Sequence, residues 1–417
     1  MTTIEFFNRF LAQIKKTPHW AVMEATVEGT HWHRESSVAV HTEMTIDQYL
    51  SLFAGQRTER QRMITLMALV FHDFGKPEAE EQKPCEDGTT RNTYAGHEPV
   101  SANEFMSFIC DHHDLRQQFF DQGFGWEDVR KIKIMIEHHL PYGLKNVTKR
   151  LALRSMVRNT LVADEDCFYD MLISDCYGRI SDDHDTKKAA VHDWIKEFRA
   201  IPVPELAPEK RMHNGLGKGK AFVTIKKPQK TMFLLYGVSG AGKSTWCTNV
   251  ADPHRNDRNQ HLSGCRTADM LVASEDAWRL QYAEQHFDEI DMSEWPRMTV
   301  QEQYDAAWKF CHLSKLSKYD AFAKAEYTKI LDSGKHFILD RMNQGRKGRA
   351  SWIEAAKQHG YRVESVEFYI SEQVAKDRQQ VRGDKCLPDY RVHQIYMQQE
   401  TPWYGPEVDA FRIVITA

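Results

Sequence analysis

The stretch LLYGVSGAGKSTW, which begins at Leu234, contains the pattern G-x-x-x-x-G-K-S between a predicted strand and a predicted helix. Glycines in such a loop let backbone N–H groups surround the β- and γ-phosphates of a nucleoside triphosphate. The lysine adds a positive charge and the serine offers a hydroxyl to Mg²⁺. We therefore predict a site for ATP (or another NTP) and Mg²⁺. The predicted contacts are Gly237, Ser239, Gly240, Ala241, Gly242, Lys243, Ser244 and Thr245.

Downstream, VASEDAWRLQ places Asp276 three residues before Arg279, on one face of a predicted helix. A carboxylate there can take a proton from an attacking hydroxyl group, while the arginine holds a neighbouring phosphate. The same spacing is also that of an ordinary surface ion pair. The pair by itself leaves both interpretations open.

Two further segments supply charge for a phosphate site. DRQQVRGDKCLP sets Arg378 and Arg382 one helical turn apart, so that both can reach the same anion, although such a pair also occurs on solvated helix faces. Asp340 ends the apolar run FILD. It is either a second acidic residue near Mg²⁺ or a turn residue that ends the strand.

The first half of the chain contains histidines and aspartates in an order that indicates a metal site, including the adjacent pair in LMALVFHDFGK. Mixed imidazole and carboxylate donors suit Mn, Fe, Co, Ni or Zn. Such a metal lowers the pKa of a bound water, so that hydroxide is available near neutrality to attack phosphorus. The predicted ligands are His41, His72, Asp73, His97, His138 and Asp175.

Two cationic residues follow predicted ligands by one helical turn. Lys76 comes one turn after His72, and Arg179 comes one turn after Asp175. Each therefore points toward the metal cavity and can hold a phosphate group there.

Two ligand positions have a competitor. His33 competes with His41, although the stretch HRESSVAVHT favours His41, and His139 competes with His138. The histidines of CDHHD, at 110–114, are expected in a charged loop and are left out of the ligand set.

The elements that must position these residues change in character along the chain. Residues 1–200 show apolar residues three and four apart, which predicts an all-α domain. Residues 201–230 begin with a segment rich in proline, glycine and charge, which predicts a linker. In residues 231–417 the short apolar runs TMFLLYG, KHFILD, RVESVEFYI and FRIVIT alternate with helical stretches. This alternation predicts an α/β domain with a parallel sheet.

Composition narrows the class of protein. The net charge of −4 comes from 55 basic and 59 acidic residues, so a basic surface for nucleic acid must be local. Eight cysteines without a CxxC pair favour a reducing compartment. The N-terminal stretch MTTIEFFNRFLAQIKK lacks a secretory signal, and no apolar run approaches the roughly 20 residues that span a bilayer. We expect a cytoplasmic protein with no membrane partner.

Residues 230–400 resemble the kinase module of phage-type polynucleotide kinase-phosphatases. The G-x-x-x-x-G-K-S loop, D-x-x-R, LDRMNQGRKGR and R-x-x-x-R-G-x-K-x-x-P carry the resemblance. It implies that Asp276 is the general base on a 5′-OH and that Arg279 binds the phosphate of the terminal nucleotide. It also implies that Arg378 and Arg382 form a lid over the ATP phosphates. The stretch DPHRNDRNQHLSGCRTAD, before Asp276, departs from the family pattern.

Residues 30–185 resemble the HD superfamily of metal-dependent phosphohydrolases, and GHEPVSA and SDCYGR are similar to its versions that act on RNA ends. An HD domain before such a kinase is the architecture of the bacterial HD-domain polynucleotide kinase-phosphatases, whose pattern Lys76 and Arg179 also match. The resemblance implies repair of RNA or DNA ends: removal of a 2′,3′-cyclic, 2′- or 3′-phosphate and phosphorylation of a 5′-OH. No ligase lysine motif is present, so we expect a separate RNA ligase as partner.

Two other function classes fit parts of the sequence. An HD nucleotidase fused to a small-molecule, nucleoside-type kinase would use both sites, but a small neutral acceptor has no 3′-phosphate for Arg279 to hold. Equal labelling of a free nucleoside and an oligonucleotide would favour that alternative. An ATP-gated RNA sensor with a structural HD site would show no turnover with any divalent metal.

Overall fold

The chain, described here by a computed structural model, divides into two units. One comprises Met1–Ala207 and Trp403–Pro406, the other Pro208–Pro402 and Glu407–Ala417. The structure describes residues 3–28, 34–84, 88, 90–203, 230–251, 270–286, 295–314, 316–383 and 385–415, without the side chains of 249–251 and 313–317. Most of the predicted linker, the stretch at 252–269 and His33 lie outside the described residues.

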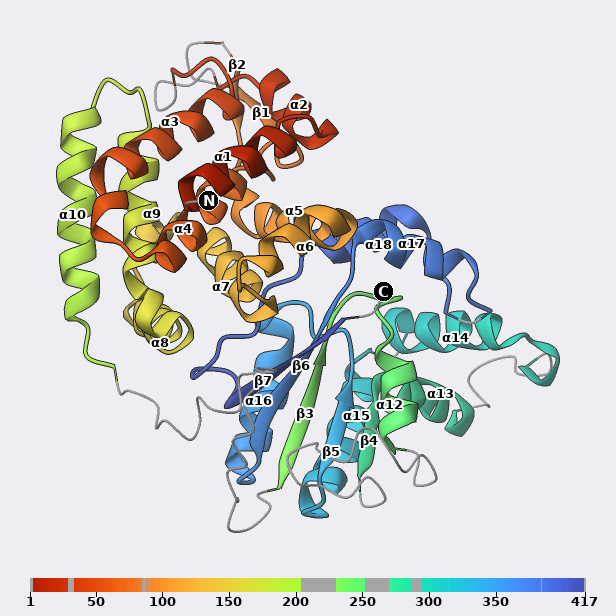
Figure 1. Cartoon of the computed structure of the whole chain (residues 1–417). Helices are drawn as coiled ribbons and strands as arrows, with labels where there is room; N and C mark the ends of the chain where they lie inside the picture. Colours follow the sequence, from red (N-terminus) through yellow and green to blue (C-terminus); the bar gives the residue numbers. More distant parts are fainter. Residues whose placement is uncertain are drawn as a thin grey trace. The chain divides into compact units, whose positions relative to one another are not determined.

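The first unit is helical, as predicted (Figure 1). Its helices are α1 (Thr3–Ile14), α2 (Pro18–Ala25), α3 (Val38–Leu52), α4 (Glu59–Phe71), α5 (His97–Asp111), α6 (His113–Asp121), α7 (Trp126–Glu137), α8 (Val147–Leu161), α9 (Glu165–Tyr177) and α10 (His184–Ala200).

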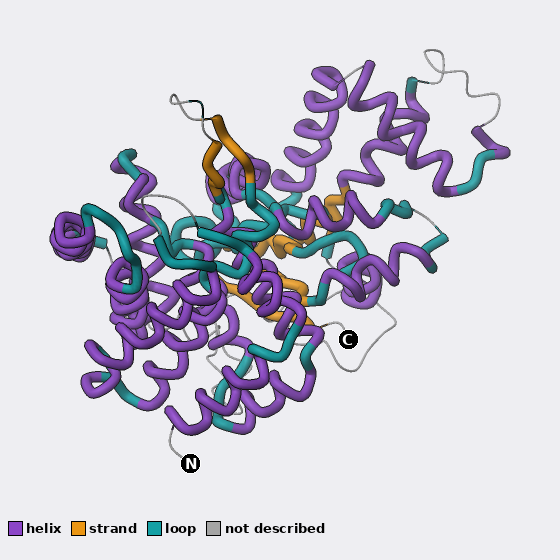
Figure 2. The backbone as a smooth tube through the Cα atoms, turned by 90° about the horizontal axis from the view of Figure 1, so that it is seen from above, coloured by secondary structure: helices purple, strands orange, loops and turns teal. Residues whose placement is uncertain are grey.

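A small antiparallel hairpin of β1 (Glu81–Pro84) and β2 (Thr90–Thr93) interrupts the helices (Figure 2). The prediction that this region lacks strands is wrong at this point. All four residues of β1 are exposed and polar or proline, so the hairpin has no apolar alternation that the sequence could reveal.

Helix α4 is the centre of the first unit and leads directly into the predicted metal ligands His72 and Asp73. It begins at a capping box, in which the Thr58 hydroxyl accepts from the Gln61 N–H at 3.2 Å and the Gln61 side chain accepts from the Thr58 N–H at 3.2 Å. Every residue from Met63 to Phe71 is buried, as expected of a helix that is apolar on all sides. The helix ends before His72, which is its C-cap, so His72 and Asp73 leave the helix together.

The second unit contains a five-stranded parallel sheet, which confirms the predicted α/β class. Its strands are β3 (Thr231–Tyr236), β4 (Leu271–Ser274), β5 (Phe337–Asp340), β6 (Arg362–Tyr369) and β7 (Ala410–Ile415), in the order β4-β5-β3-β6-β7. The helices are α12 (Lys243–Ala251), α13 (Glu275–Gln285), α14 (Val300–Lys309), α15 (Leu316–Asp332), α16 (Arg346–Gln358), α17 (Glu372–Gln380) and α18 (Asp389–Met397). Strand β4 was not predicted, because in LVAS only Ala273 is buried.

The order of the strands explains where a ligand binds in this unit. All six residues of the central strand β3 are buried, and β3 lies between β5 and β6 (Figure 1). In open parallel sheets, ligands bind beyond the carboxyl ends of the strands, where the strand order reverses. The phosphate-loop sequence follows the carboxyl end of β3 and therefore stands at this position.

Among the described residues, no helix combines the length and the apolar character needed to cross a membrane.

A fully buried arginine on α16 ties the loop after β5 to the last part of the chain. Arg349 donates to the Glu407 carboxylate at 2.8 and 3.0 Å and to the Asn343 and Glu400 carbonyl oxygens at 2.9 Å each. The ion pair and the backbone acceptors thus replace the hydrogen bonds to water that the guanidinium loses on burial.

Replacing Arg349 with alanine should lower the stability of the second unit by about 3–5 kcal/mol, because it leaves buried acceptors without a donor. Urea titration followed by hydrogen exchange of peptides from β3 and β6 measures this unit directly. Lys347→Ala, at an exposed position of the same helix, is the control and should stay within about 0.5 kcal/mol of wild type. Equal midpoints for the two variants would contradict the role of Arg349.

Candidate active sites

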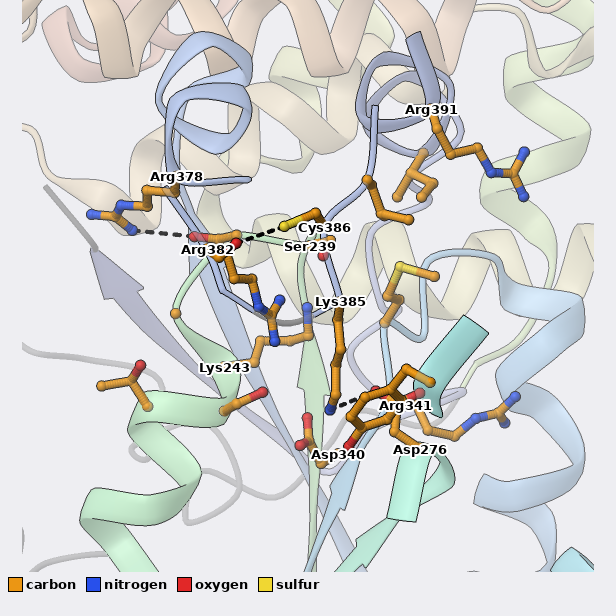
Figure 3. Close-up of a pocket in the computed structure, with 18 of the residues that line it drawn as sticks. Ser239, Lys243, Asp276, Asp340, Arg341, Arg378, Arg382, Lys385, Cys386 and Arg391 are labelled. Atoms are coloured by element: carbon orange, nitrogen blue, oxygen red, sulfur yellow. Dashed lines mark hydrogen bonds and ion pairs between the residues drawn. The ribbon is translucent and has the colours of Figure 1, made fainter. Parts of the chain in front are cut away.

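A cavity of about 1530 Å³ in the second unit collects the predicted phosphate-binding residues (Figure 3). Its walls come from the loop after β3, the first turn of α13, one face of α14, the end of β5 and the segment from α17 to α18. Predicted residues that line it are Ser239, Gly240, Gly242, Lys243, Ser244, Thr245, Asp276, Arg279, Asp340, Arg378 and Arg382.

The loop after β3 has a conformation that only glycine adopts easily. Gly240 and Gly242 have φ values of +88° and +87°. A Cβ atom at Gly240 would lie 2.8 Å from the Ala375 carbonyl oxygen, so α17 packs against the loop too closely for any side chain there.

The lysine of the loop is buried against backbone oxygen atoms. The Lys243 ammonium group donates to the Gly237 carbonyl at 2.7 Å and to the Val238 carbonyl at 2.8 Å. Burial lowers the pKa of Lys243 to about 8, against the opposing attraction of Asp340, and the positive charge of Arg382 also lowers it. A phosphate group bound at this place would be an anion close to Lys243 and would favour its charged ammonium form.

The predicted pair Asp276–Arg279 lies inside the cavity, on the first turns of α13. One oxygen of Asp276 accepts from Arg279 at 2.9 Å and the other pairs with the Lys385 ammonium group at 3.0 Å. The two residues therefore form an ion pair, and this pair lies in the same cavity as the phosphate loop.

Two residues beside this pair were not predicted as site residues. Glu275 accepts from Arg279 at 2.6 Å through one oxygen and pairs with Arg341 through the other, which holds the two guanidinium groups next to each other. Lys385 was visible in the sequence as the lysine of R-x-x-x-R-G-x-K-x-x-P, whereas the pairing of Glu275 with Arg341 joins residues far apart in sequence.

The two predicted lid arginines do not share one helix. Helix α17 ends at Gln380, so Arg378 lies on it and Arg382 lies beyond its end. Gly383 follows directly, and glycine is a poor helix former, which explains the early end. Arg378 donates to the Gly240 carbonyl at 3.3 Å, and the Arg382 side chain extends toward Lys243 (Figure 3). Both arginines still reach the loop.

In the first unit, the carboxylate of Asp73 lies between two pairs of imidazole rings. Its Oδ2 atom is 3.1 Å from His72 Nε2 and 3.5 Å from His41 Nε2. Its Oδ1 atom is 3.1 Å from His97 Nε2 and 3.6 Å from His139 Nε2. All five residues are buried, and their donor atoms form two groups with the spacing of metal ligands.

The spacing of these donors fits transition metals. Asp175 adds an oxygen 3.0 Å from His41 Nε2 and 3.7 Å from His72 Nε2. With metal–ligand bonds of about 2.1 Å, neighbouring ligand atoms around one cation are about 3.0–3.4 Å apart. The donors on either side of Asp73 can therefore each hold one cation, with Asp73 shared between them.

The imidazole rings are oriented by backbone carbonyls three residues earlier. The contacts are His72 Nδ1 to Leu69 O at 2.7 Å, His97 Nδ1 to Tyr94 O at 2.6 Å, and His139 Nδ1 to Ile136 O at 2.8 Å. A carbonyl can only accept, so each Nδ1 carries a proton and each Nε2 is the ring nitrogen that faces the carboxylates.

The expectation that His138 is a ligand is corrected by this geometry. Helix α7 ends at Glu137, and His138 Nε2 accepts from the Trp403 indole N–H of the same unit at 3.1 Å. His139, the competing residue, instead joins His97 and Asp73. His41 lies with His72 and Asp73 in a group at metal-ligand spacing, and its competitor His33 lies outside the described residues.

The predicted phosphate-holding cations contact the metal-site carboxylates. The Lys76 ammonium group is 2.7 Å from Asp73 Oδ2, and Arg179 Nη2 donates to Asp175 Oδ2 at 2.5 Å. Burial by itself would raise the pKa of both carboxyl groups. His72 and Lys76 nevertheless hold the pKa of Asp73 well below its ordinary value, and Arg179 with the histidines does so for Asp175. Both groups are thus present as carboxylates, the form that binds metal.

Two buried carboxylates next to this cluster were missed. Glu28 pairs with Lys76, while Glu35 lies 3.5 Å from His41 Nδ1 and accepts from the Ile180 N–H at 2.7 Å. Neither glutamate lies in a periodic pattern, so only the fold places them there. With His41 they form a further group at metal-ligand spacing.

Residues 232–401 match the protein family described as an AAA domain. Together with the loop after β3 and the parallel sheet, this match decides the class of the second unit. It is a P-loop kinase-like, nucleotide-binding domain. Such a domain uses a nucleoside triphosphate with Mg²⁺. No curated protein matches the chain.

Variants of the two adjacent histidines should separate their roles. His139→Ala removes an Nε2 donor and should weaken Mn²⁺ binding by about tenfold or more, whereas His138→Ala should leave it nearly unchanged. Isothermal titration of the metal-stripped full chain with Mn²⁺ measures both. The assignment is wrong if the two folded variants lose Mn²⁺ affinity equally.

Proposed function

We propose that this protein repairs nucleic-acid ends. The P-loop kinase-like domain would transfer the γ-phosphoryl group of ATP to a 5′-OH, and the helical unit would remove a 2′,3′-cyclic, 2′- or 3′-phosphate. The observation that carries the kinase half is the position of Asp276 and Arg279 in the same cavity as the phosphate loop. A separate ligase would then join the two repaired ends.

On the donor side of the cavity, the chain offers charge rather than covalent chemistry. Lys243, Arg378 and Arg382 would neutralise the phosphates of ATP and orient the γ-phosphoryl group for in-line transfer. Mg²⁺, held through Ser244 with Asp340 nearby, would add further charge neutralisation between the β- and γ-phosphates.

On the acceptor side, Asp276 would accept the proton of the attacking hydroxyl group. Arg279 and Lys385 both pair with this carboxylate, which makes it a weaker acceptor of a proton. A phosphate of the acceptor strand would attract Arg279 away from Asp276, which would couple binding of the strand to activation of the base. A neutral nucleoside without a phosphate would not.

The size of the cavity also favours a strand as acceptor. Sites for small molecules usually enclose about 300–1,000 Å³. The cavity here, at about 1530 Å³, exceeds that range and is rich in lysine and arginine. A nucleoside triphosphate together with the end of a polynucleotide would use this space, whereas a small neutral acceptor would leave much of it empty.

In the helical unit, Lys76 and Arg179 would bind and orient the terminal phosphate, in line with their place beside Asp73 and Asp175. The imidazole and carboxylate donors fit Mn, Fe, Co, Ni or Zn. A bound cation of this kind supplies Lewis acidity, which polarises a phosphate ester and favours attack by water. The surrounding protein excludes bulk water from the buried donors.

The two reactions should be separable by mutation. Asp73→Ala should abolish removal of a 2′,3′-cyclic phosphate and leave transfer of label from γ-labelled ATP to a 5′-OH oligonucleotide nearly intact. Lys243→Ala should do the reverse, because its charge acts only on the nucleotide. Both assays on both variants, with RNA and DNA strands, a panel of divalent metals and circular dichroism as a folding check, decide the matter. Folded Asp73→Ala without kinase activity would exclude two independent sites.

Asp276→Asn should lower the rate of 5′ phosphorylation about a hundredfold or more, because an amide cannot accept the proton. The KM for ATP should change little. Asp332→Asn, at an exposed aspartate on α15, is the matched control and should behave as wild type. Near-normal 5′ phosphorylation by Asp276→Asn would remove this residue from the base role. Equal labelling of a free nucleoside and an oligonucleotide by wild type would instead indicate a small-molecule kinase.

A further inference from the structure

One face of α14 lines the cavity and has no part in the mechanism above. The residues on it are Gln301, Tyr304, Asp305 and Trp308, which are three, four and seven positions apart and therefore form one stripe of the helix. Two of the four are aromatic. A stripe of this kind in a basic cavity differs from an isolated exposed aromatic residue, which is common on protein surfaces.

The indole of Trp308 is held firmly and remains accessible. It is 48% exposed, and it stacks on the His312 ring with centroids 4.4 Å apart and an interplanar angle of 16°. Stacking on His312 restricts the plane of the indole, and the partly exposed Trp308 lines the cavity. Binding a flat group there would require little reordering of the side chain.

The aromatic stripe runs alongside the charged residues of the acceptor side. Tyr304 contacts the Lys385 ammonium group, with 4.1 Å from Nζ to the ring centroid, and Lys385 pairs with Asp276. One turn further along α14, Trp308 lines the same cavity as Arg279. His312, its stacking partner, is close enough for the positive charge of Arg279 to add to the effect of burial in lowering the pKa of His312.

A contact of Cys311, three residues after Trp308, also relates this part of the chain to Arg279. Cys311 Sγ lies 3.9 Å from the Arg279 carbonyl oxygen, so the segment that follows α14 packs directly on the turn of α13 that carries Arg279. A phosphate held by Arg279 would therefore have the indole beside it. In a nucleic-acid strand, the flat group nearest to each phosphate is the nucleobase, which is attached through the sugar.

We propose that Trp308 is a stacking platform for a nucleobase of the acceptor strand, adjacent to the phosphate held by Arg279. This inference rests on the proposed 5′-kinase function. It explains why the same site would prefer a nucleic-acid strand to a small acceptor. Every base has a π-face, so the contact would be insensitive to sequence. The platform would thus serve broken ends of any sequence.

The experiment measures 5′ phosphorylation of oligonucleotides by the full chain carrying Trp308→Ala or Trp308→Phe. Trp308→Ala should raise the KM for the oligonucleotide by roughly five- to a hundredfold, the usual range for a lost base–aromatic stack, and leave the KM for ATP unchanged. Trp308→Phe should retain part of the affinity. Val300→Ala, at an exposed position of the same helix outside the cavity, is the control and should match wild type.

Oligonucleotides with an abasic site at the first or the second nucleotide identify the stacked base. At one of these two positions, loss of the base should weaken wild type but should not weaken Trp308→Ala further, because the indole and the base act as a pair. Independent losses at both positions would overturn the proposal. So would an unchanged oligonucleotide KM in Trp308→Ala while wild type is active, and the proposed function would then stand. Wild type that phosphorylates no 5′-OH strand would refute the proposed function and the platform together.

Discussion

The buried carboxylate of Asp73 organises the first unit, because an isolated charge in a protein interior is strongly unfavourable. Both of its oxygens face imidazole nitrogens, and Lys76 pairs with it from a third side. These partners come from α3, the turn after α4, the first turn of α5 and the segment after α7, so these helices must meet at this carboxylate. The packing of α4, which is buried on all sides, delivers it to that point.

The second unit also buries a charged group, but here the group is a cation. Lys243 is buried against carbonyl oxygens, and burial favours its neutral form. Seven lysine and arginine side chains and four carboxylates line the described walls of the cavity, so its charge is locally positive although the whole chain carries −4. A polyanionic ligand such as a nucleoside triphosphate or a nucleic-acid strand would satisfy this excess. The charge balance of the cavity therefore supports phosphoryl chemistry independently of the loop motif.

Each set of chemical groups lies within one unit. The metal-type donors come from residues 28–175, and the cavity is lined by residues 239–414 of the second unit. Under the proposed function, two sites in one chain suit a substrate that presents two chemical problems. A broken strand with a 5′-OH on one side and a terminal phosphate on the other is such a substrate, since a ligase can join it only after both ends are corrected.

The acceptor side of the cavity shows how ion pairs can serve recognition. Glu275 holds Arg279 and Arg341 side by side, and Asp276 holds Arg279 and Lys385. Such pairing keeps the cations in position while limiting their mutual repulsion. A phosphate that replaces one carboxylate would then meet donors that are already oriented, which lowers the entropic cost of binding.

The sequence by itself determined the phosphate loop, the parallel sheet and the order of most metal-type donors, because these depend on local spacing and apolar periodicity. Spacing does not say which of two neighbouring side chains points into a site, however, because this depends on the residue at which the helix ends. The end of α7 turns His139 toward Asp73 and leaves His138 to Trp403, while the end of α17 separates Arg378 from Arg382. Glu28, Glu275 and Trp308 gain their places only when distant segments pack together. Tertiary structure alone decided these positions, since no pattern within one segment encodes a contact with another.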